Sequence, residues 1–265
     1  MNETSSQSMF DSGVSTGCTW LSPGSGMGQL AARRALSRGW KVAALDVNAA
    51  GLDALGNDSK LLKLVVDVTD AAAVTEAVNR AEQELGALDS VTNAAAIMPL
   101  GLLTDQPGHV MHKIMAINYG GLVNITKAAL PRMLARRRGD FISFASMVGH
   151  WPIMYMGAYS ASKFAVVAFT EVLYHENLGN GVRFACVCPP AVATPLLQQA
   201  RDTVYPKMLE AAKPVSPDSV LDSVDRALLR GEFMVVTDTT SRAAWHLRRF
   251  APKLLWRYVH RVEGR

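Results

Sequence analysis

Tyr159 and Lys163 are the two residues whose types and spacing point most directly to chemistry. Residues four positions apart on a helix lie one above the other on the same face, so one site could hold both side chains. A free tyrosine has a pKa of about 10, and a neighbouring cation favours the phenolate and lowers that value. The pair therefore predicts a general acid/base, although such a pair alone more often marks a solvated helix face.

Ser146 strengthens the functional interpretation. It lies 13 residues before Tyr159, at the end of the apolar run 141–145, which is typical of a buried strand. A hydroxyl at a strand end can donate a hydrogen bond to a substrate carbonyl oxygen while the tyrosine exchanges its proton. The small residues between Tyr159 and Lys163, and a glycine-rich turn near the N-terminus, point the same way.

This combination resembles the short-chain dehydrogenase/reductase family, whose members carry a serine, a tyrosine and a lysine at this spacing on a Rossmann-like fold. The resemblance covers about residues 24–236. It implies a catalytic set of Asn118, Ser146, Tyr159 and Lys163, called the tetrad below, in which Asn118 kinks its helix and holds a water in the proton relay to the lysine. It also implies hydride transfer between an alcohol carbon and a nicotinamide cofactor.

The elements that must position these residues predict an α/β fold. Apolar runs of strand length alternate with helical periodicity, which is typical of a single doubly wound, Rossmann-like domain with a mostly parallel sheet and helices on both faces. A chain of 265 residues, 49% of them hydrophobic, suits one such domain. We expect a divergent segment at 1–23, the catalytic domain at 24–240 and a basic amphipathic helix at 241–265.

Residues 1–23 agree least with the family pattern. A dinucleotide fold needs a buried apolar strand that leads into the glycine-rich turn, yet residues 12–23 are mostly small and polar. We therefore expect the first strand to be poor or absent. Leu21 and Ser22 stand where the family has threonine and glycine, and the match resumes at Gly24. This favours an altered start, such as a frame slip or a misplaced splice, over simple divergence.

The expected cofactor contacts follow the ends of successive strands. Asp46 follows the second strand, and its carboxylate can accept hydrogen bonds from the adenosine ribose and repel a 2′-phosphate. Ser25 stands where NADP-preferring relatives often carry a basic residue, so both positions favour NAD over NADP. The contacts implied by the resemblance are Gly24, Ser25, Gly26, Met27, Gly28, Asp46, Asp67, Val68, Asn93, Ala94, Ala95, Tyr159, Lys163, Pro189, Val192 and Thr194.

Large apolar and thioether side chains fill the segment between Ser146 and Tyr159. Loops after strand ends border the ligand crevice in this architecture, so we expect a bulky apolar alcohol or carbonyl substrate: a steroid, a terpenoid, an aromatic or a long-chain alcohol. Alternatively, Met154 and Met156 cover the core or a subunit contact, and His150 is merely exposed. The expected substrate contacts are Ser146, Val148, His150, Trp151, Met154 and Tyr159.

Composition argues against several classes of protein. A membrane-spanning helix needs a run of about 18 apolar residues, and the sequence contains no such run. The first residues lack the pattern of a secretory signal, and the three cysteines show no CxxC spacing, so we expect a cytoplasmic protein with buried thiols and no metal site. The net charge of +4 is unevenly distributed: residues 242–265 carry +6, so the rest of the chain carries −2. A basic tail on a nearly neutral body predicts no nucleic-acid partner.

The basic segment 243–262 is amphipathic, and Pro252 should kink or restart its helix. It could lie on an anionic membrane surface, pack on a subunit partner, or shield the substrate pocket. We rank packing first and peripheral membrane contact second. The resemblance also implies a homodimer or homotetramer.

Two functions other than catalysis stay open. One is a binding or scaffold protein on a catalytically impaired fold, favoured by the missing front glycine and by Pro190, which replaces a family glycine and lacks a backbone donor. The other is a peripheral membrane protein that acts through its basic C-terminal helix. The intact tetrad favours the enzyme over both.

Overall fold

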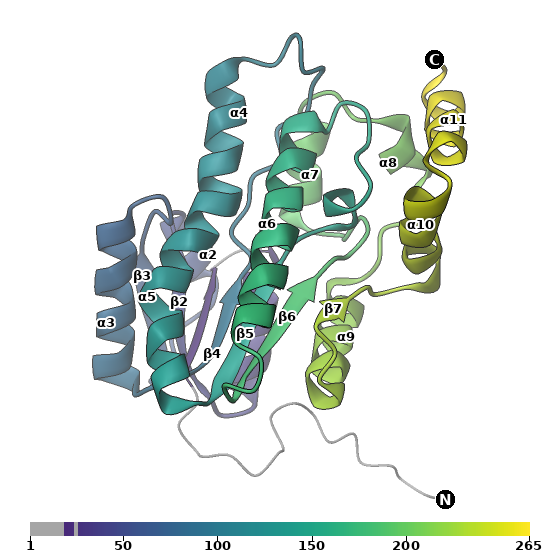
Figure 1. Cartoon of the computed structure of the whole chain (residues 1–265). Coiled ribbons are helices and arrows are strands. Elements are labelled where there is room, and N and C mark those ends of the chain that lie inside the picture. Colours follow the sequence, from purple (N-terminus) through teal and green to yellow (C-terminus); the bar gives the residue numbers. More distant parts are fainter. Residues whose placement is uncertain (1–18, 24–25) are drawn as a thin grey trace, which may run out of the picture.

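Seven strands in the described part of the chain form one sheet, and every pair of neighbouring strands is parallel. The computed structural model describes residues 19–23 and 26–265 (Figure 1). The strands lie in the order β3-β2-β1-β4-β5-β6-β7. They are β1 (Thr19–Pro23), β2 (Lys41–Asp46), β3 (Leu61–Val65), β4 (Leu88–Asn93), β5 (Gly139–Phe144), β6 (Val182–Val187) and β7 (Met234–Val235).

This strand order confirms the predicted doubly wound α/β class. Strands are added in one direction from β1 to β3 and in the other from β4 to β7. The reversal leaves a crevice outside the carboxyl ends of the strands, which is where ligands bind in such sheets. The sheet therefore provides one edge at which residues far apart in sequence can meet.

Helices cover both faces of the sheet (Figure 1). Side chains alternate between the two faces of a strand, and β2 shows this clearly: Ala43 and Leu45 pack in the cluster that contains α3, α5 and α6, whereas Val42 and Ala44 pack in the cluster that contains α1 and α9. The helices of this part are α1 (Gly26–Ser37), α2 (Ala49–Asp53), α3 (Ala71–Leu85), α4 (Gly108–Met115), α5 (Gly121–Arg136), α6 (Gly157–Glu176) and α9 (Pro217–Arg230).

The first strand forms although its sequence argued against it. β1 pairs with β2 from Thr19 to Pro23 and also pairs with β4, with a shift of register between Thr19 and Trp20. The alternative that this strand is absent is therefore wrong for residues 19–23, whereas the expectation of a poor strand stays a prediction. The ladder of a parallel sheet is made by main-chain groups, which polar residues supply as well as apolar ones do. Residues 12–18, where the strand was also sought, lie outside the described residues.

The C-terminal part forms four further helices: α7 (Pro195–Arg201), α8 (Lys207–Ala211), α10 (Thr239–Phe250) and α11 (Pro252–Glu263). The basic segment therefore forms two helices. The second begins at Pro252, directly after Ala251, as predicted. α11 buries Leu255 and Val259 and packs on α8. The segment therefore packs on its own chain, whereas a contact of this segment with a subunit partner stays a prediction. No helix in the described residues combines the length and the hydropathy needed to cross a bilayer.

Candidate active site

The hydroxyls of Ser146 and Tyr159 lie close enough to interact, and this interaction works to lower the pKa of Tyr159. Ser146 comes two residues after β5 and begins the short 3-10 helix η2 (Met147–Gly149), whose Val148 N–H donates to its Oγ at 3.3 Å. Tyr159 lies in the first turn of α6 and is 5% exposed. The structure therefore brings a strand end and a helix start together, and it places the two hydroxyls where one substrate oxygen could meet both.

Lys163 lies one helical turn beyond Tyr159, with its ammonium 5.7 Å from the centre of the tyrosine ring. It is 2% exposed, and its Nζ donates a hydrogen bond to the carbonyl of Phe144 at 2.8 Å. Burial lowers the pKa of Lys163 to about 8, although the nearby thiols of Cys188 and Cys186 oppose that change. In the chain alone the ammonium is therefore tied to the strand end that precedes Ser146.

The prediction that the lysine lowers the tyrosine pKa is wrong for the chain alone. Burial raises the pKa of Tyr159 well above its usual value, and the interaction with Ser146 opposes this only in part. Loss of water disfavours the charged form of either group. Burial therefore raises the pKa of Tyr159 and lowers that of Lys163, and each change favours the neutral side chain. A phenol held in this way needs a further cation nearby before it can act as a base.

Asn118 occupies a distorted turn, as the kink implied. The π-helix η1 (Ala116–Gly120) separates α4 from α5, and Asn118 within it is 1% exposed. Its Nδ2 donates to the Ile97 carbonyl at 3.1 Å and to Ser162 Oγ at 3.0 Å, and its Oδ1 accepts from Ile97 N–H at 2.9 Å. Asn118 therefore fastens the loop after β4 to α6 through Ser162, a contact that the sequence reasoning missed.

The first part of the expected cofactor site lies at the start of α1 and the end of β4. Gly26 begins α1 with φ +53°, and a Cβ built on it would meet no atom within 4 Å. The Oδ1 of Asn93 is buried at the end of β4 without a hydrogen-bond partner among the described residues. Met27 and Gly28 follow in α1, Ala94 and Ala95 follow β4, and Gly24 and Ser25 lie outside the described residues.

The acidic residues of the expected cofactor site make local hydrogen bonds. Asp46 Oδ1 accepts from Asn48 N–H at 2.9 Å, and Asp67 Oδ1 accepts from the N–H and the hydroxyl of Thr69, each at 2.8 Å. The carbonyl of Val68 accepts from Asn124 Nδ2 at 2.8 Å. These contacts order the loops after β2 and β3 at the edge of the sheet where a dinucleotide would lie.

The loop after β6 joins the expected cofactor site to the serine. The carbonyl of Pro189 accepts from Met147 N–H at 3.0 Å and, at 3.5 Å, from Ser146 Oγ. Val192 forms a bridge with Val215. Thr194 precedes α7, and its hydroxyl donates to the Val192 carbonyl at 3.4 Å. The structure therefore holds the expected contacts of this loop beside Ser146.

An apolar cluster surrounds Tyr159. It contains Val148, which was expected, and Met156, which is buried there. The rest of it includes residues from the loop after β4 and from α7 and α8 that sequence reasoning missed, although apolar residues recur through 196–209. The buried members are Met98, Leu100, Val148, Met156, Tyr159, Leu197, Ala200 and Leu209. Trp151 and Met154, also expected, are partly buried outside this cluster.

His150, another expected substrate contact, faces the sheet and the tail. Its Nε2 lies 3.5 Å from Cys188 Sγ, and its ring lies 5.1 Å from the ring of Trp245 in α10. Cys188 Sγ also lies 3.9 Å from Cys186 Sγ. Hydrogen bonding from Cys186, then from His150, lowers the pKa of Cys188 to about 6, whereas that of Cys186 is raised. His150 thus links the serine loop to β6 and to α10.

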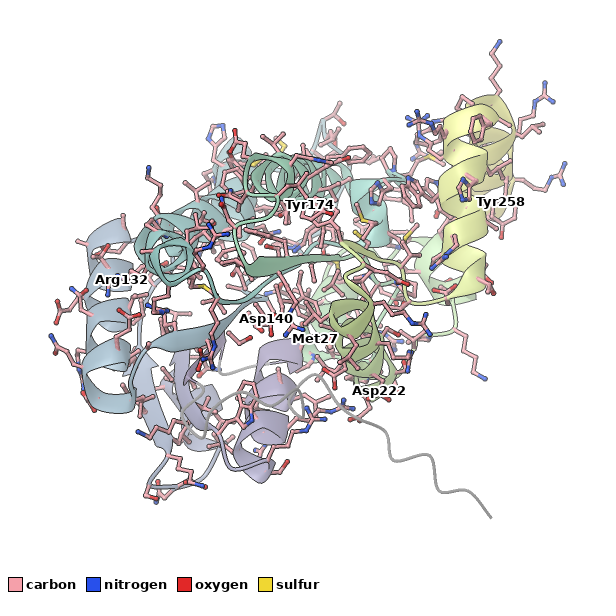
Figure 2. All side chains as sticks on the ribbon, turned by 60° about the horizontal axis from the view of Figure 1, so that its bottom comes forward. Met27, Arg132, Asp140, Tyr174, Asp222 and Tyr258 are labelled. Carbon is pink, nitrogen blue, oxygen red and sulfur yellow. The ribbon has the colours of Figure 1, made fainter. Side chains whose placement is uncertain are left out.

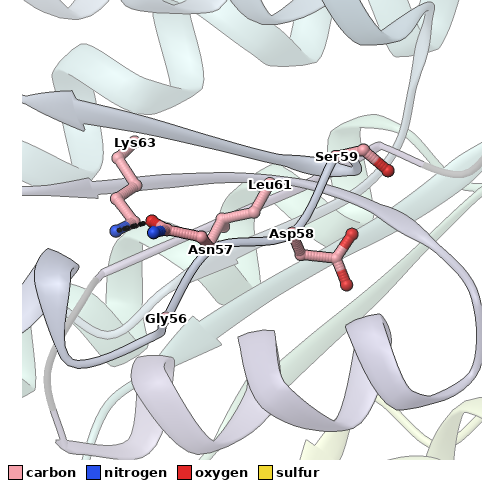
Figure 3. A pocket seen from close by; sticks show the side chains of 6 residues that line it. All are labelled: Gly56, Asn57, Asp58, Ser59, Leu61 and Lys63. Atoms are coloured by element: carbon pink, nitrogen blue, oxygen red, sulfur yellow. Dashed lines mark hydrogen bonds between the residues drawn. The ribbon is translucent and has the colours of Figure 1, made fainter.

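A surface hollow of about 520 Å³ lies elsewhere on the molecule (Figure 3). It is lined by the loop between α2 and β3 and by the first residues of β3, including Lys63, whose Nζ lies 3.5 Å from Asn57 Oδ1. The tetrad follows strand ends, whereas this hollow lies where a strand begins, so it does not belong to the site. Among the described residues, no group of three or more His, Cys, Asp or Glu is arranged to hold a metal ion.

Comparison with known proteins decides the family. A family model described as short chain dehydrogenase matches residues 21–204. The chain belongs to the short-chain dehydrogenase/reductase family. It is accordingly an oxidoreductase that acts on CH–OH groups.

Two relatives and one solved structure illustrate the similarity. The chain is 37% identical over 178 residues to 2-(S)-hydroxypropyl-CoM dehydrogenase 3 of Xanthobacter autotrophicus, which covers 64% of this chain and 69% of that protein. It is 27% identical to 17-beta-hydroxysteroid dehydrogenase 13 of Rattus norvegicus over 91% of this chain and 81% of that protein. A short-chain dehydrogenase/reductase from Burkholderia phymatum, solved in complex with NAD, superposes with a TM-score of 0.79 at 24% identity over 90% of this chain and 95% of that one, which supports the fold.

Proposed function

We propose that this protein interconverts a bulky apolar alcohol and its ketone or aldehyde, with NAD as cofactor and Tyr159 as general acid/base. The contact between the Ser146 and Tyr159 hydroxyls carries the proposal. Ser146 Oγ orients the substrate oxygen, and Tyr159 Oη exchanges the proton with it. Lys163 supplies positive charge one helical turn away, and Asn118 holds the surrounding loops in place.

The residues present fit a nicotinamide dinucleotide. When bound, the nicotinamide exchanges the hydride with the substrate carbon and, in its oxidised form, carries the positive charge that favours a phenolate. The open space at Gly26 and the N-terminus of α1 suit a pyrophosphate. The unpartnered Oδ1 of Asn93 is an acceptor for a hydroxyl group, and Asp46 at the end of β2 supports the choice of NAD over NADP.

The apolar cluster around Tyr159 supports the substrate class. Its side chains offer contact area to a hydrocarbon and few polar partners. Of the relatives compared, one is named for a steroid alcohol, which agrees with such a lining. A steroid, a terpenoid, an aromatic alcohol and a long-chain alcohol would each meet this description.

A panel of these alcohols, assayed with NAD and with NADP, tests the proposal directly. We expect turnover of at least one apolar alcohol with NAD, and a kcat at least about 100-fold lower for a Tyr159→Phe variant under the same conditions. Turnover restricted to small polar alcohols would contradict the substrate class. Cofactor binding without turnover across the panel would favour the alternative of a binding protein on this fold.

We further propose that the protein forms a homodimer or homotetramer. Exposed Phe164 and Val172 on α6 support a subunit contact on that helix. Light scattering of the purified protein, compared with a Val172→Glu variant, measures the assembly. A monomer at micromolar concentration would contradict it.

A further inference from the structure

The outward side of α10 and α11 carries a stripe of large apolar side chains. Leu247, Phe250, Leu254 and Tyr258 are all exposed, and Phe250 is 77% exposed. Their spacing of three or four positions places Leu247 with Phe250, and Leu254 with Tyr258, on one face of each helix. Figure 2 shows α11, labelled at Tyr258, at the edge of the molecule with side chains projecting away from the sheet.

The opposite side of the two helices is fixed to the body of the protein. Trp245 packs against the large core cluster, and Leu255 and Val259 are buried where α11 meets α8. The carboxylate of Glu263 accepts hydrogen bonds from the N–H groups of Lys207 and Met208 at 3.3 and 2.9 Å. The apolar stripe is therefore on the outer face of helices that are fixed to the body of the protein, and no part of the chain that the structure describes covers it.

Basic residues flank the stripe. Arg249, Lys253, Arg257 and Arg261 are exposed, and within the described residues none of them lies within 4.0 Å of a carboxylate. Glu263 is the one acid between 239 and 265, and it is buried. The face consequently presents positive charge and apolar surface together, without a balancing acid.

We propose that this face docks the protein on the surface of an anionic lipid bilayer. A helix with an apolar stripe flanked by lysine and arginine lies in the interface plane, where its apolar side chains enter the acyl boundary and its cations meet acidic headgroups. A second copy of the chain fits less well. A two-fold contact through the same patch would set the four basic residues of one copy against the basic residues of the other, with no exposed acid in the segment to balance them.

The helices that carry the proposed membrane face also contact the segment between Ser146 and Tyr159. Trp245 lies against His150, and the guanidinium of Arg265 lies 5.4 Å from the centre of the Tyr155 ring. Both contacts reach the segment between Ser146 and Tyr159. Docking would therefore bring the substrate side of the site close to the bilayer, from which an apolar alcohol could enter. This last step rests on the proposed function, whereas the docking itself does not.

Sedimentation with lipid vesicles tests the docking. We expect the full chain to bind vesicles of phosphatidylcholine mixed with phosphatidylserine, to bind phosphatidylcholine vesicles far less, and to lose binding as salt rises. A Phe250→Ser, Leu254→Ser double variant and a variant with Arg249, Lys253 and Arg257 changed to Gln should each bind at least tenfold more weakly. Leu229→Ser, which alters an exposed apolar residue of α9, is the matched control and should bind normally.

Three outcomes would overturn the docking proposal. They are no binding of the unaltered chain to acidic vesicles, equal binding by the stripe variants, and dissociation of an oligomer by the Phe250→Ser, Leu254→Ser pair without a change in vesicle binding. Turnover of a water-soluble alcohol by the same variants separates this test from the proposed function. Variants that keep turnover but lose vesicle binding support docking, and failure of turnover in the unaltered chain counts against the proposed function alone.

Discussion

Lys163 donates to the carbonyl of Phe144 at 2.8 Å, so the ammonium of α6 is tied to the last residue of β5. Ser146 follows that residue by two positions. The same side chain that supplies charge near Tyr159 therefore also holds the strand end from which the serine projects. A substitution of Lys163 should therefore remove the positive charge near Tyr159 and also shift the end of β5 that positions Ser146.

The pH dependence of stability should reveal the buried lysine. The pKa of Lys163 is about 8 in the folded protein, against an ordinary value of 10.5 for a lysine side chain. Between these two values the unfolded chain binds the proton and the folded chain does not. The free energy of unfolding therefore rises with pH across this window. Below pH 8 the destabilisation caused by burying the ammonium is fully present. Relative to Lys163→Met, the unaltered protein should gain melting temperature from pH 7.5 to 9.5. An unchanged difference would mean that the ammonium is well solvated.

Tyr159→Phe should lower kcat by at least about 100-fold, because it removes the proton donor. The hydroxyl interacts with Ser146 and the ring stays in the apolar cluster, so we expect the melting temperature and NAD affinity to change little. Steady-state kinetics and calorimetric titration measure the two effects. Loss of folding in this variant would instead indicate a structural tyrosine.

Asp46→Ala should narrow the preference for NAD. The carboxylate at the end of β2 repels a 2′-phosphate, and one such repulsion at the protein surface amounts to about 1 kcal/mol, or several-fold in affinity. The ratio of kcat/KM for NAD to that for NADP measures the change, and Asp53→Ala on the neighbouring helix α2 is the control. Equal efficiency with both cofactors in the unaltered protein would refute the assignment.

Gly149→Ala should reduce both stability and turnover. A Cβ at Gly149 would lie 2.8 Å from the main-chain oxygen of Lys163 and 3.0 Å from Val167 Cγ2, so η2 would have to move away from α6. Overpacking of this kind costs about 1–3 kcal/mol. Gly108→Ala, where a Cβ would meet no atom within 4 Å, is the control. Denaturant titration and kcat for both variants check the prediction, and equal behaviour would show that the loop adapts freely.

Spacing along the chain predicted the parts of the site that depend on local periodicity. Tyr159 and Lys163 share a face of α6 because they are four residues apart, and Pro252 restarts the terminal helix because it lacks an N–H. The doubly wound order followed from the alternation of strands and helices. These are properties of neighbouring residues, which a sequence records directly.

The parts that sequence reasoning missed depend on three-dimensional surroundings. We doubted β1 because residues 12–23 are mostly small and polar. The strand is nevertheless held by main-chain pairing with β2 on one side and β4 on the other. The sign of the Tyr159 pKa shift depends on burial, which spacing does not record. Leu197 and Leu209 join the cluster around Tyr159 only because α7 and α8 fold over the loop after β4.

Glu263 caps a helix that begins 56 positions earlier in the chain, at Lys207. α8 has five residues, and a helix of that length does not persist in water without external support. α8 also carries Leu209, which packs in the cluster around Tyr159. Proteolytic cleavage at Ala251, between α10 and α11, would therefore release the cap and loosen the wall of the substrate site while leaving the tetrad intact. The junction between the two terminal helices is thus a point at which substrate affinity could be lost without loss of the chemistry.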